Sequence, residues 1–564
     1  MKTRLIPVAA LAVTSLAAIA LLSVGSGAVR SDEESFEFRP ETLVLSRSVY
    51  EGTASTVTVG QTLPPGCAAK TVAVPLIAGG TTNVKVTCGA AVSDGEYPNL
   101  NNSNNVWNND GPDASFGVTS PIFLDNITED GDPLGTLPIP TNLVVTSFSS
   151  KSELALNLAD DGRTITFVGY HGGPGFVTGP NQLDVSNSNT PGVVDPTNPV
   201  QSSYFRAVIE VDSRGHIMRT DGNAYSGNNG RAAGKANGNY YMAGNDNNGG
   251  LSKTQLTTTQ VGINLITSTG NEFLVPGQNP PTPPNINMIG DFEVTQLGEG
   301  FPPDKAGKDN NFRGLRIFNN TLFVTKGSGG NGVNTVYQVG DGGTLPTPAN
   351  APGSNLKNVP ITILPGFPTN LASGLDAAGN PSGIPVQFPF GIFFANDHTL
   401  YVCDEGDGTL VEPREVNGQM NVASDAALAT AGLQKWTLSN ADGKWHMIYV
   451  LQNGLNIGVP YSVEDYPESL NPATGGCRNL AGRTDGNGNV VLFAVTSTIS
   501  ANGDQGADPN KLVRVVDHLG STTLPTANGN GQGEKWGVFT TIRAAKAGEV
   551  LRGVAFAPKE HGNN

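Results

Sequence analysis

The stretch Asp309–Gly340, DNNFRGLRIFNNTLFVTKGSGGNGVNTVYQVG, contains the pattern that decides the fold. Short runs in which apolar and polar residues alternate follow one another here: Gly314–Phe318, Thr321–Thr325 and Thr335–Val339. Asn319-Asn320 separates the first two runs, and a glycine-rich loop separates the second from the third. Such runs, rich in β-branched and aromatic residues, are typical of a β-meander. A fourth run, Val359–Leu364, completes a four-stranded antiparallel unit that needs neighbours to bury both faces.

This unit recurs along the chain. Each copy has a polar or charged start, a small-apolar alternation, a turn and an aromatic-rich second strand. The copies begin at Ser152, Gly230, Phe312, Phe390, Cys477 and Leu551. Repeats of this kind in a ring form a β-propeller, which leaves few open sheet edges. The sequence therefore predicts an all-β, six-bladed β-propeller of four-stranded antiparallel blades. A seventh blade would be present if Val261–Val275 and Asn287–Gln296 formed a further unit.

The two ends of the chain predict how the ring closes. The last copy, Leu551–Ala557, has only its first strand before the chain ends. Predicted strands that belong to no blade stand near the N-terminus: Leu43–Tyr50, Ser120–Leu124 and Leu143–Ser147. We expect the closing blade to combine one C-terminal strand with these three N-terminal strands.

The phrases DNNFRGL (309–315), LFVTKGSGGNGVNTVYQVG (322–340) and LRGVAFAP (551–558) resemble those of a family of secreted, propeller-like bacterial proteins without assigned function. SELALNLADDGRTITFVGY (152–170) resembles a blade of the same family. The similarity covers most of the chain after Leu43. It implies a propeller in an extracytoplasmic setting, and it transfers no catalytic residue to this chain.

Residues 1–28 have the pattern of a secretory signal peptide. Lys2 and Arg4 provide the charged start, Leu5–Val24 the apolar segment, and Ser26-Gly27-Ala28 a cleavage site flanked by small residues. The alternative is an uncleaved anchor, because the apolar segment approaches membrane-spanning length. We expect cleavage, a linker over residues 29–42, a propeller over residues 43–564, and a secreted or periplasmic monomer that does not bind membranes.

The charge balance limits the partners. The chain has 33 Lys and Arg against 49 Asp and Glu, a formal net charge of −16. This excess of acidic residues disfavours general binding to nucleic acids or anionic membranes. It is compatible with calcium binding or with solubility alone.

Four cysteines in an oxidising compartment predict two disulfides. Cys67 and Cys88 both lie in an insertion over residues 51–112, for which we predict a small β-structure with its own disulfide. Cys403 ends the second strand of one blade and Cys477 begins the first strand of the next, so a bridge between them is plausible. The sequence leaves all three pairings open.

In a propeller blade, the first strand begins at the face where the second strand ends. This face is predicted to carry the starts of the first strands: Glu153, Arg231, Arg313, Arg478 and Arg552. It also carries the ends of the second strands: His171, Asp246, Lys326, Asp404 and Glu405. Because arginine suits bidentate capture of carboxylate or phosphate, the arginines and Lys326 predict a site for an anionic ligand. The alternative is that they pair with Glu153, Asp404 and Glu405 or cap backbone carbonyls between blades.

Two further candidates concern metal and acid–base chemistry. Asp404, Glu405 and Asp407 could supply oxygen ligands to calcium. His171, flanked by glycines at the channel mouth where it could be exposed and mobile, is the candidate general base. The chain has neither a GxSxG nor an HExxH motif, which disfavours hydrolases of those types.

Two classes of function follow from these residues. One is an exported binding propeller for a small anionic or glycan ligand. The other is an enzyme on the same ring, either a calcium-dependent esterase or phosphatase or a quinone-dependent sugar dehydrogenase with His171 as base. These two classes can be distinguished by whether the arginines and His171 converge in one pocket and whether Asp404 is unpaired.

Overall fold

In the computed structural model, residues 36–560 form part of one compact unit that spans Phe36–Asn564. Within residues 36–560 the structure describes all but these: 51–57, 64–66, 76–78, 92–118, 148–151, 172–187, 192–197, 199–203, 223, 246–261, 268–285, 289–310, 328–331, 357, 377–379, 409–413, 417–418, 422–428, 500–507 and 527–535. The predicted signal peptide, the candidate Asp246 and most of the predicted insertion lie outside the described residues. In the described part of the chain, the 3₁₀ helices Pro352–Ser354 and Glu468–Leu470 occur among the β-strands.

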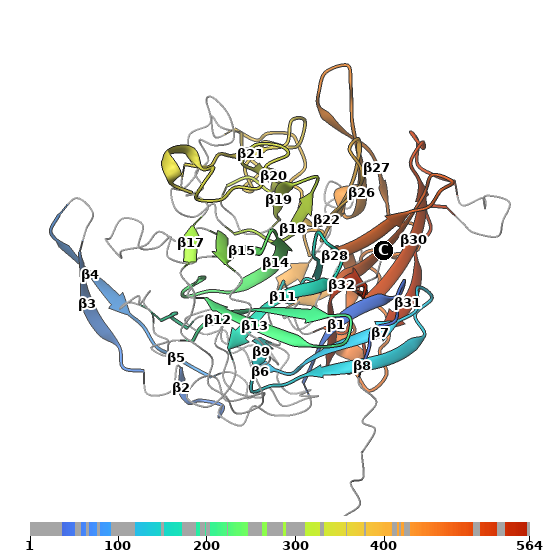
Figure 1. Ribbon diagram of the computed structural model, residues 1–564. Helices are drawn as coiled ribbons and strands as arrows, with labels where there is room; N and C mark the ends of the chain where they lie inside the picture. The colour runs from blue at the N-terminus through green and yellow to red at the C-terminus, as the bar shows by residue number, and fades with distance from the viewer. Residues whose placement is uncertain are drawn as a thin grey trace, which may run out of the picture. The chain divides into compact units, whose positions relative to one another are not determined.

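Six four-stranded antiparallel blades are arranged as a β-propeller, which confirms the predicted fold (Figure 1). Blades 1 to 5 follow one another along the chain, each from inner to outer strand. Blade 1 contains β10 (Asn157–Leu158), β11 (Thr164–His171), β12 (Arg206–Asp212) and β13 (Ile217–Gly222). Blade 2 contains β14 (Gly230–Ala236), β15 (Asn239–Gly244), β16 (Ile263–Thr267) and β17 (Ile286–Met288). Blade 3 contains β18 (Leu315–Phe318), β19 (Thr321–Lys326), β20 (Thr335–Val339) and β21 (Ile361–Ile363).

The next two blades have the same order. Blade 4 contains β22 (Pro389–Asn396), β23 (Thr399–Asp404), β26 (Gly432–Leu438) and β27 (Trp445–Leu451). Blade 5 contains β28 (Ala473–Thr484), β29 (Asn489–Ile499), β30 (Lys511–His518) and β31 (Thr540–Ala544). The residues considered for a seventh blade contribute β16 and β17 to blade 2, so the described part of the chain has six blades.

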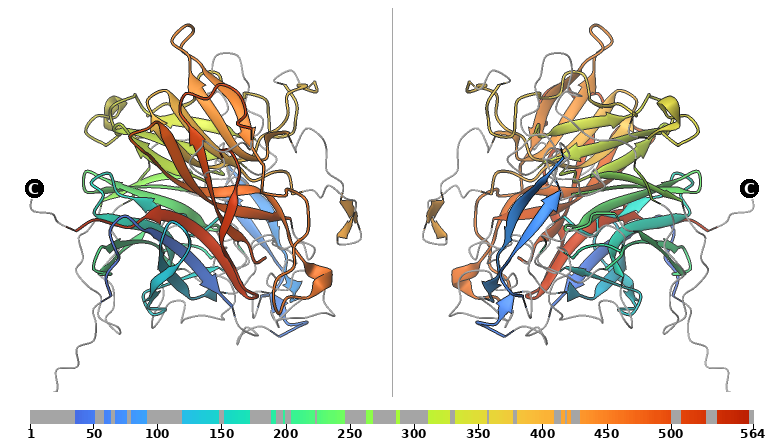
Figure 2. Two further views of the ribbon diagram at one scale, coloured as in Figure 1. Left: turned by 90° about the vertical axis from the view of Figure 1, so that its right-hand side faces the viewer. Right: turned by 90° about the vertical axis from the view of Figure 1, so that its left-hand side faces the viewer.

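Blade 6 closes the ring with strands from both ends of the chain. Its strand order is β32 (Glu549–Phe556), β1 (Leu43–Val49), β7 (Ile122–Ile127) and β8 (Pro133–Ile139). Figure 2 shows the blue N-terminal strands beside the red C-terminal strand, and Leu45 of β1 is paired with Val554 of β32. The predicted closure by one C-terminal and three N-terminal strands is confirmed.

One of the three N-terminal segments predicted for this blade forms a strand in another sheet. Residues 144–147 form β9 (Val144–Ser147), which pairs with β11 of blade 1 and with β6 (Thr119–Ser120). The fourth strand of blade 6 is instead β8, whose sequence contains Pro133 and Pro138. Proline lacks the backbone N–H that a central strand must donate, and β8 can contain it because it is the edge strand of its sheet.

Among the described residues, three two-stranded antiparallel sheets lie outside the blades. They are β2 (Thr62–Leu63) with β5 (Gly89–Ala90), β3 (Lys70–Pro75) with β4 (Thr81–Val86), and β24 (Arg414–Val416) with β25 (Gln419–Asn421). The Cys67–Cys88 disulfide joins the segment before β3 to the segment after β4. The Cys403–Cys477 disulfide joins β23 of blade 4 to β28 of blade 5. The two expected disulfides are therefore present. Among the described residues, no helix is long and apolar enough to cross a membrane.

The core lies between neighbouring blades. Buried side chains of adjacent sheets pack together, as Tyr401 and Leu433 of blade 4 do with Leu480 and Leu492 of blade 5. The inner strands approach their neighbours closely. At Gly314 a Cβ atom would lie 2.1 Å from the carbonyl oxygen of Phe390 in the next blade. The small residues at the blade starts are thus required by blade packing, and they bring the adjacent polar residues of different blades close together.

Candidate functional site

Blade 1 begins with an irregular segment, Ser152-Glu153-Leu154, because its inner strand β10 starts only at Asn157. Leu154 is fully buried and has a φ of 61°, a left-handed conformation that is strained for a branched residue. The carbonyl of Leu154 accepts a 2.8 Å hydrogen bond from Ser46 Oγ of blade 6, which holds the segment in place. The strained backbone positions Ser152 and Glu153 among the starts of the neighbouring blades.

The hydroxyl of Ser152 joins three blades. It accepts a 2.7 Å hydrogen bond from Arg231 Nε of blade 2 and a 2.5 Å hydrogen bond from Arg313 Nη1 of blade 3. Arg231 Nη1 also donates to the carbonyl of Phe312, at 2.9 Å. Two of the predicted arginines therefore converge on one neutral oxygen.

The aromatic ring of Phe390 connects Arg313 to a third arginine. The guanidinium carbons of Arg313 and Arg478 lie 5.5 Å and 6.0 Å from its centroid, within the range of cation–π attraction. Arg478 Nε forms a buried ion pair with Glu405 Oε2 at 3.0 Å. We call Ser152, Arg231, Arg313, Phe390, Arg478 and Glu405 the arginine cluster.

The fourth predicted arginine, Arg552, belongs to the closing blade. It is buried and donates from Nε to Ser48 Oγ at 3.1 Å and from Nη2 to the carbonyl of Ser147 at 3.5 Å. Its own carbonyl accepts a hydrogen bond from Asn479, the residue after Arg478. This hydrogen bond places Arg552 next to the arginine cluster.

Burial and mutual repulsion make the arginine cluster electrostatically costly. Burial lowers the pKa of Arg231 well below its usual value, and the charge of Arg313 lowers it further. Burial also lowers the pKa of Arg313 to about 10. The charge of Arg478 lowers this pKa further, whereas the charge of Glu405 raises it. Three guanidinium groups are thus close enough to destabilise one another.

Two guanidinium nitrogens in the arginine cluster are buried donors that lack an acceptor. Arg313 Nε and Arg478 Nη2 have no hydrogen-bond partner in the part of the chain that the structure describes. The side chains of Arg313 and Arg478 are only 6% and 4% exposed, so water does not solvate them freely. A buried donor without an acceptor costs free energy, and an anion would satisfy both nitrogens.

The carboxylates near the arginine cluster accept hydrogen bonds from groups outside it. Glu153 accepts hydrogen bonds from Thr146 Oγ1 at 2.6 Å, from the backbone N–H of Ser147 at 3.0 Å and from the Tyr170 hydroxyl. Its charge nevertheless raises the pKa of Arg231. Glu153 thus helps to hold blade 1 while partly compensating the arginine charge.

Asp404 accepts hydrogen bonds from three N–H donors. The backbone N–H groups of Phe388 and Gly406 donate to it at 2.9 Å each, and Gln434 Nε2 donates at 3.0 Å. Burial raises the pKa of Asp404 to about 7, although the backbone donors act in the opposite direction. Glu405 pairs with Arg478, whereas Asp407 is exposed. No group of three His, Cys, Asp or Glu residues suited to holding a metal ion occurs in the described ranges, and calcium binding stays a prediction.

The candidate base His171 is buried rather than exposed at the mouth. Its side chain is 1% exposed, and its Nδ1 lies 3.0 Å from Asp221 Oδ2. Asp221 also lies 3.3 Å from Arg219 Nε. The end of β11 pairs with β9 at His171 and Val144, and the His171 ring lies beside Asp221 and Phe205.

Lys326 is fully buried at the end of β19 and donates to Asn334 Oδ1 at 3.0 Å within its own blade. Ser152 and Phe390 are the members of the arginine cluster that the sequence analysis did not propose as site residues. Both are the first residues of repeats, so their positions were the available signal. Their neutral side chains gave no reason to single them out.

No protein-family model matches the chain, and no curated protein matches it. Among solved structures, a putative 6-phosphogluconolactonase from Bacteroides uniformis matches with a TM-score of 0.31 and 10% identity over 77% of this chain and 94% of that chain. The N-terminal domain of Nup159 matches with a TM-score of 0.27 and 6% identity over 92% of this chain and 97% of that chain. A Pyrococcus horikoshii acylaminoacyl peptidase matches with a TM-score of 0.26 and 9% identity over 84% of this chain and 52% of that chain. Values this low carry no argument about the function of this chain.

Proposed function

We propose that this protein is an exported β-propeller that binds a small anionic ligand at the arginine cluster. The observation that carries this proposal is the pair of buried donors, Arg313 Nε and Arg478 Nη2, that lack an acceptor among the described residues. Both donors belong to guanidinium groups beside the same phenyl ring. An oxyanion bound between them would satisfy the donors and reduce the repulsion between the arginines.

The ligand chemistry follows from the partners of the arginine cluster. Planar guanidinium groups recognise carboxylate and phosphate oxygens in bidentate fashion. Phe390 adds an apolar surface, which suits a ligand that has a carbon skeleton as well as its charge. Small carboxylates, phosphates and acidic sugars fit this description, and neutral sugars do not use the charge of the arginine cluster.

Export is supported by the pattern of residues 1–28 and by the two disulfides, which persist in oxidising compartments. Binding is a better proposal than catalysis because the candidate catalytic groups are held by other residues. His171 pairs with Asp221, and Asp404 is held by two backbone N–H groups.

Isothermal titration calorimetry of the purified protein tests the proposal. Citrate and galacturonate, which carry no phosphate or sulfate group, are titrated at constant ionic strength, with galactose as the neutral control. We expect binding of at least one anion and none of galactose, and we expect the Arg313→Leu and Arg478→Leu variants to bind at least tenfold more weakly.

Arg483→Leu is the matched control. Arg483 lies on the same strand as Arg478, but its side chain is 44% exposed and pairs with Glu129. This variant should retain wild-type affinity. Equal affinities in all four proteins, or no heat of binding with any anion, would refute the proposed site.

A further inference from the structure

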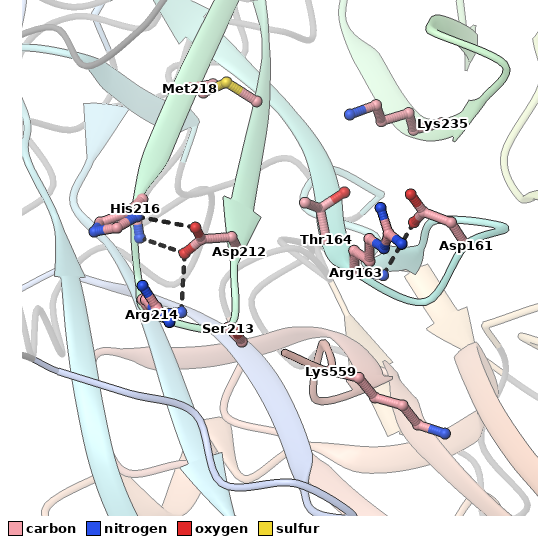
Figure 3. A pocket seen from close by; sticks show the side chains of 10 residues that line it. All are labelled: Asp161, Arg163, Thr164, Asp212, Ser213, Arg214, His216, Met218, Lys235 and Lys559. Atoms are coloured by element: carbon pink, nitrogen blue, oxygen red, sulfur yellow. Dashed lines mark hydrogen bonds and ion pairs between the residues drawn. The ribbon is translucent and has the colours of Figure 1, made fainter. Parts of the chain in front are cut away.

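A basic pocket lies at the other end of β14 from Arg231 of the arginine cluster, and Figure 3 shows its lining side chains. It has a volume of about 410 Å³ and is formed by the β10–β11 turn, the β12–β13 turn, the end of β14 and the C-terminal tail. Arg231 of the arginine cluster and Lys235 of this pocket lie on β14, separated by four residues. At the rise of an extended strand this corresponds to about 13 Å. The two sites are therefore separate.

Backbone hydrogen bonds between different segments fix the walls of this pocket. The N–H of Lys559 in the tail donates to the carbonyl of Gly162 at 2.9 Å, and the N–H of Asp160 donates to that of Lys235 at 3.3 Å. The N–H of Phe38 donates to the carbonyl of Ser213 at 2.8 Å. A pocket whose walls are already joined loses little conformational entropy when a ligand binds.

Positive charge dominates the pocket lining. Four cationic side chains line it: Arg163, Arg214, Lys235 and Lys559. The only two carboxylates among its lining residues, Asp161 and Asp212, are used within their own turns. Asp161 Oδ1 accepts from the N–H of Arg163 at 3.0 Å, and Asp212 Oδ1 accepts from the N–H groups of Arg214 and His216 at 2.9 Å each.

Two carboxylates outside the lining pair with two of these cations. Glu210 pairs with Lys235 at 2.5 Å. Glu560 lies 3.3 Å from Arg214, but both side chains are at least half exposed, so solvent screens this pair. Lys559, from the tail, is exposed on the pocket wall.

A buried hydroxyl in the pocket lacks a partner. Thr164 is 9% exposed, and its Oγ1 has no hydrogen-bond partner among the described residues. Figure 3 shows Thr164 between the Asp161 and Asp212 turns, with its hydroxyl directed to the side on which Lys235 lies. A hydroxyl in this position can donate to an anion held by the surrounding cations.

We infer that this pocket binds the phosphate or sulfate group of a small molecule. A tetrahedral oxyanion can accept hydrogen bonds from several directions at once, which matches cationic side chains contributed by separate segments. Met218 provides an apolar wall for the rest of the ligand. This inference is independent of the proposed function, because it uses none of the residues of the arginine cluster.

Titration with inorganic phosphate, and separately with sulfate, at constant ionic strength tests this inference. The Arg313→Leu protein serves as the background, so that binding at the arginine cluster does not contribute. We expect calorimetric binding of phosphate or sulfate in this background. Adding Lys559→Ala or Arg163→Ala should weaken it at least tenfold.

Thr164→Val separates a ligand-binding role from a structural one. Valine has nearly the same shape as threonine and removes only the hydroxyl, so the fold and thermal midpoint should be kept while affinity falls at least threefold. Lys444→Ala, a change of an exposed lysine in a turn of blade 4, is the control and should leave affinity unchanged. No binding in the Arg313→Leu background, or equal affinity in every variant, would overturn the inference.

Discussion

Asp517, between blades 4 and 5, offers the sharpest test of how adjacent blades are held together. Its carboxylate accepts hydrogen bonds from Tyr401 at 2.6 Å and from Tyr449 at 2.8 Å, and it lies 3.2 Å from Lys435 Nζ. The side chains of Asp517 and Lys435 are both fully buried. Lys435 also donates to the carbonyl of His518 at 2.6 Å. Each charge therefore depends on groups from the neighbouring blade.

Replacing Asp517 with Asn keeps the shape but leaves the Lys435 ammonium without its counter-charge. Removing one partner of a buried ion pair typically costs about 3–5 kcal/mol. Because Lys435 retains backbone carbonyls as acceptors, we expect a loss at the lower end, about 3 kcal/mol in the free energy of unfolding. Lys435→Met should cost a similar amount.

The assay is urea denaturation followed by tryptophan fluorescence, since Trp436 is buried next to Lys435 in the sequence. Replacing both partners with apolar residues, as in Lys435→Met with Asp517→Leu, should cost clearly less than the sum of the two single losses. A loss below about 1 kcal/mol for Asp517→Asn, or strictly additive losses, would refute the argument that this pair is coupled.

Three further predictions concern other parts of the ring. Cys403–Cys477 closes a loop with a sequence separation of 74 residues, so the Cys403→Ala/Cys477→Ala protein should lose about 4 kcal/mol in urea denaturation; an unchanged denaturation midpoint would contradict this. Because the pKa of Asp404 is raised to about 7 in the folded state, its contribution to stability is complete below its unfolded value of 3.8 and is lost as the pH rises through 7. Between these two pKa values the free energy of unfolding should fall by about 1.4 kcal/mol per pH unit, and the Asp404→Asn variant should lack this decrease. If the stability–pH curves of the wild type and the variant are parallel, Asp404 stays ionised in the folded state. Gly314→Ala should destabilise the protein by several degrees in thermal midpoint because its Cβ meets a backbone oxygen of Phe390, whereas Gly486→Ala, with no atom within 4 Å of the added Cβ, should be neutral; similar midpoints would contradict the close approach of the blades.

The blade count and the closure could be predicted because they depend on local patterns. The inner strand of each blade has small residues and a polar start, which recur visibly in the sequence. The strand Pro133–Ile139 escaped prediction because its prolines disfavour a central strand and only its edge position tolerates them. Leu143–Ser147 was predicted as a strand, but strand character does not reveal which sheet the strand joins.

The candidate site was predictable in part for the same reason. Arg231, Arg313 and Arg478 stand at equivalent repeat positions, and the ring brings equivalent positions together. Their contacts depend on the register between blades, which local sequence does not determine. Hence the shared acceptor Ser152 and the ring of Phe390 became apparent only in the structure, as did the burial of His171.

The central claim is that the arginine cluster, which joins neighbouring blades, also binds an anion. The most direct measurement is the thermal midpoint of the wild-type and Arg313→Leu proteins, with and without citrate, at constant ionic strength; citrate carries no phosphate or sulfate group for the basic pocket. Removing a buried, repelled charge should leave the anion-free variant at least as stable as the wild type, and only the wild type should be stabilised by the anion. A variant that is much less stable than the wild type and gains as much from the anion would contradict the claim.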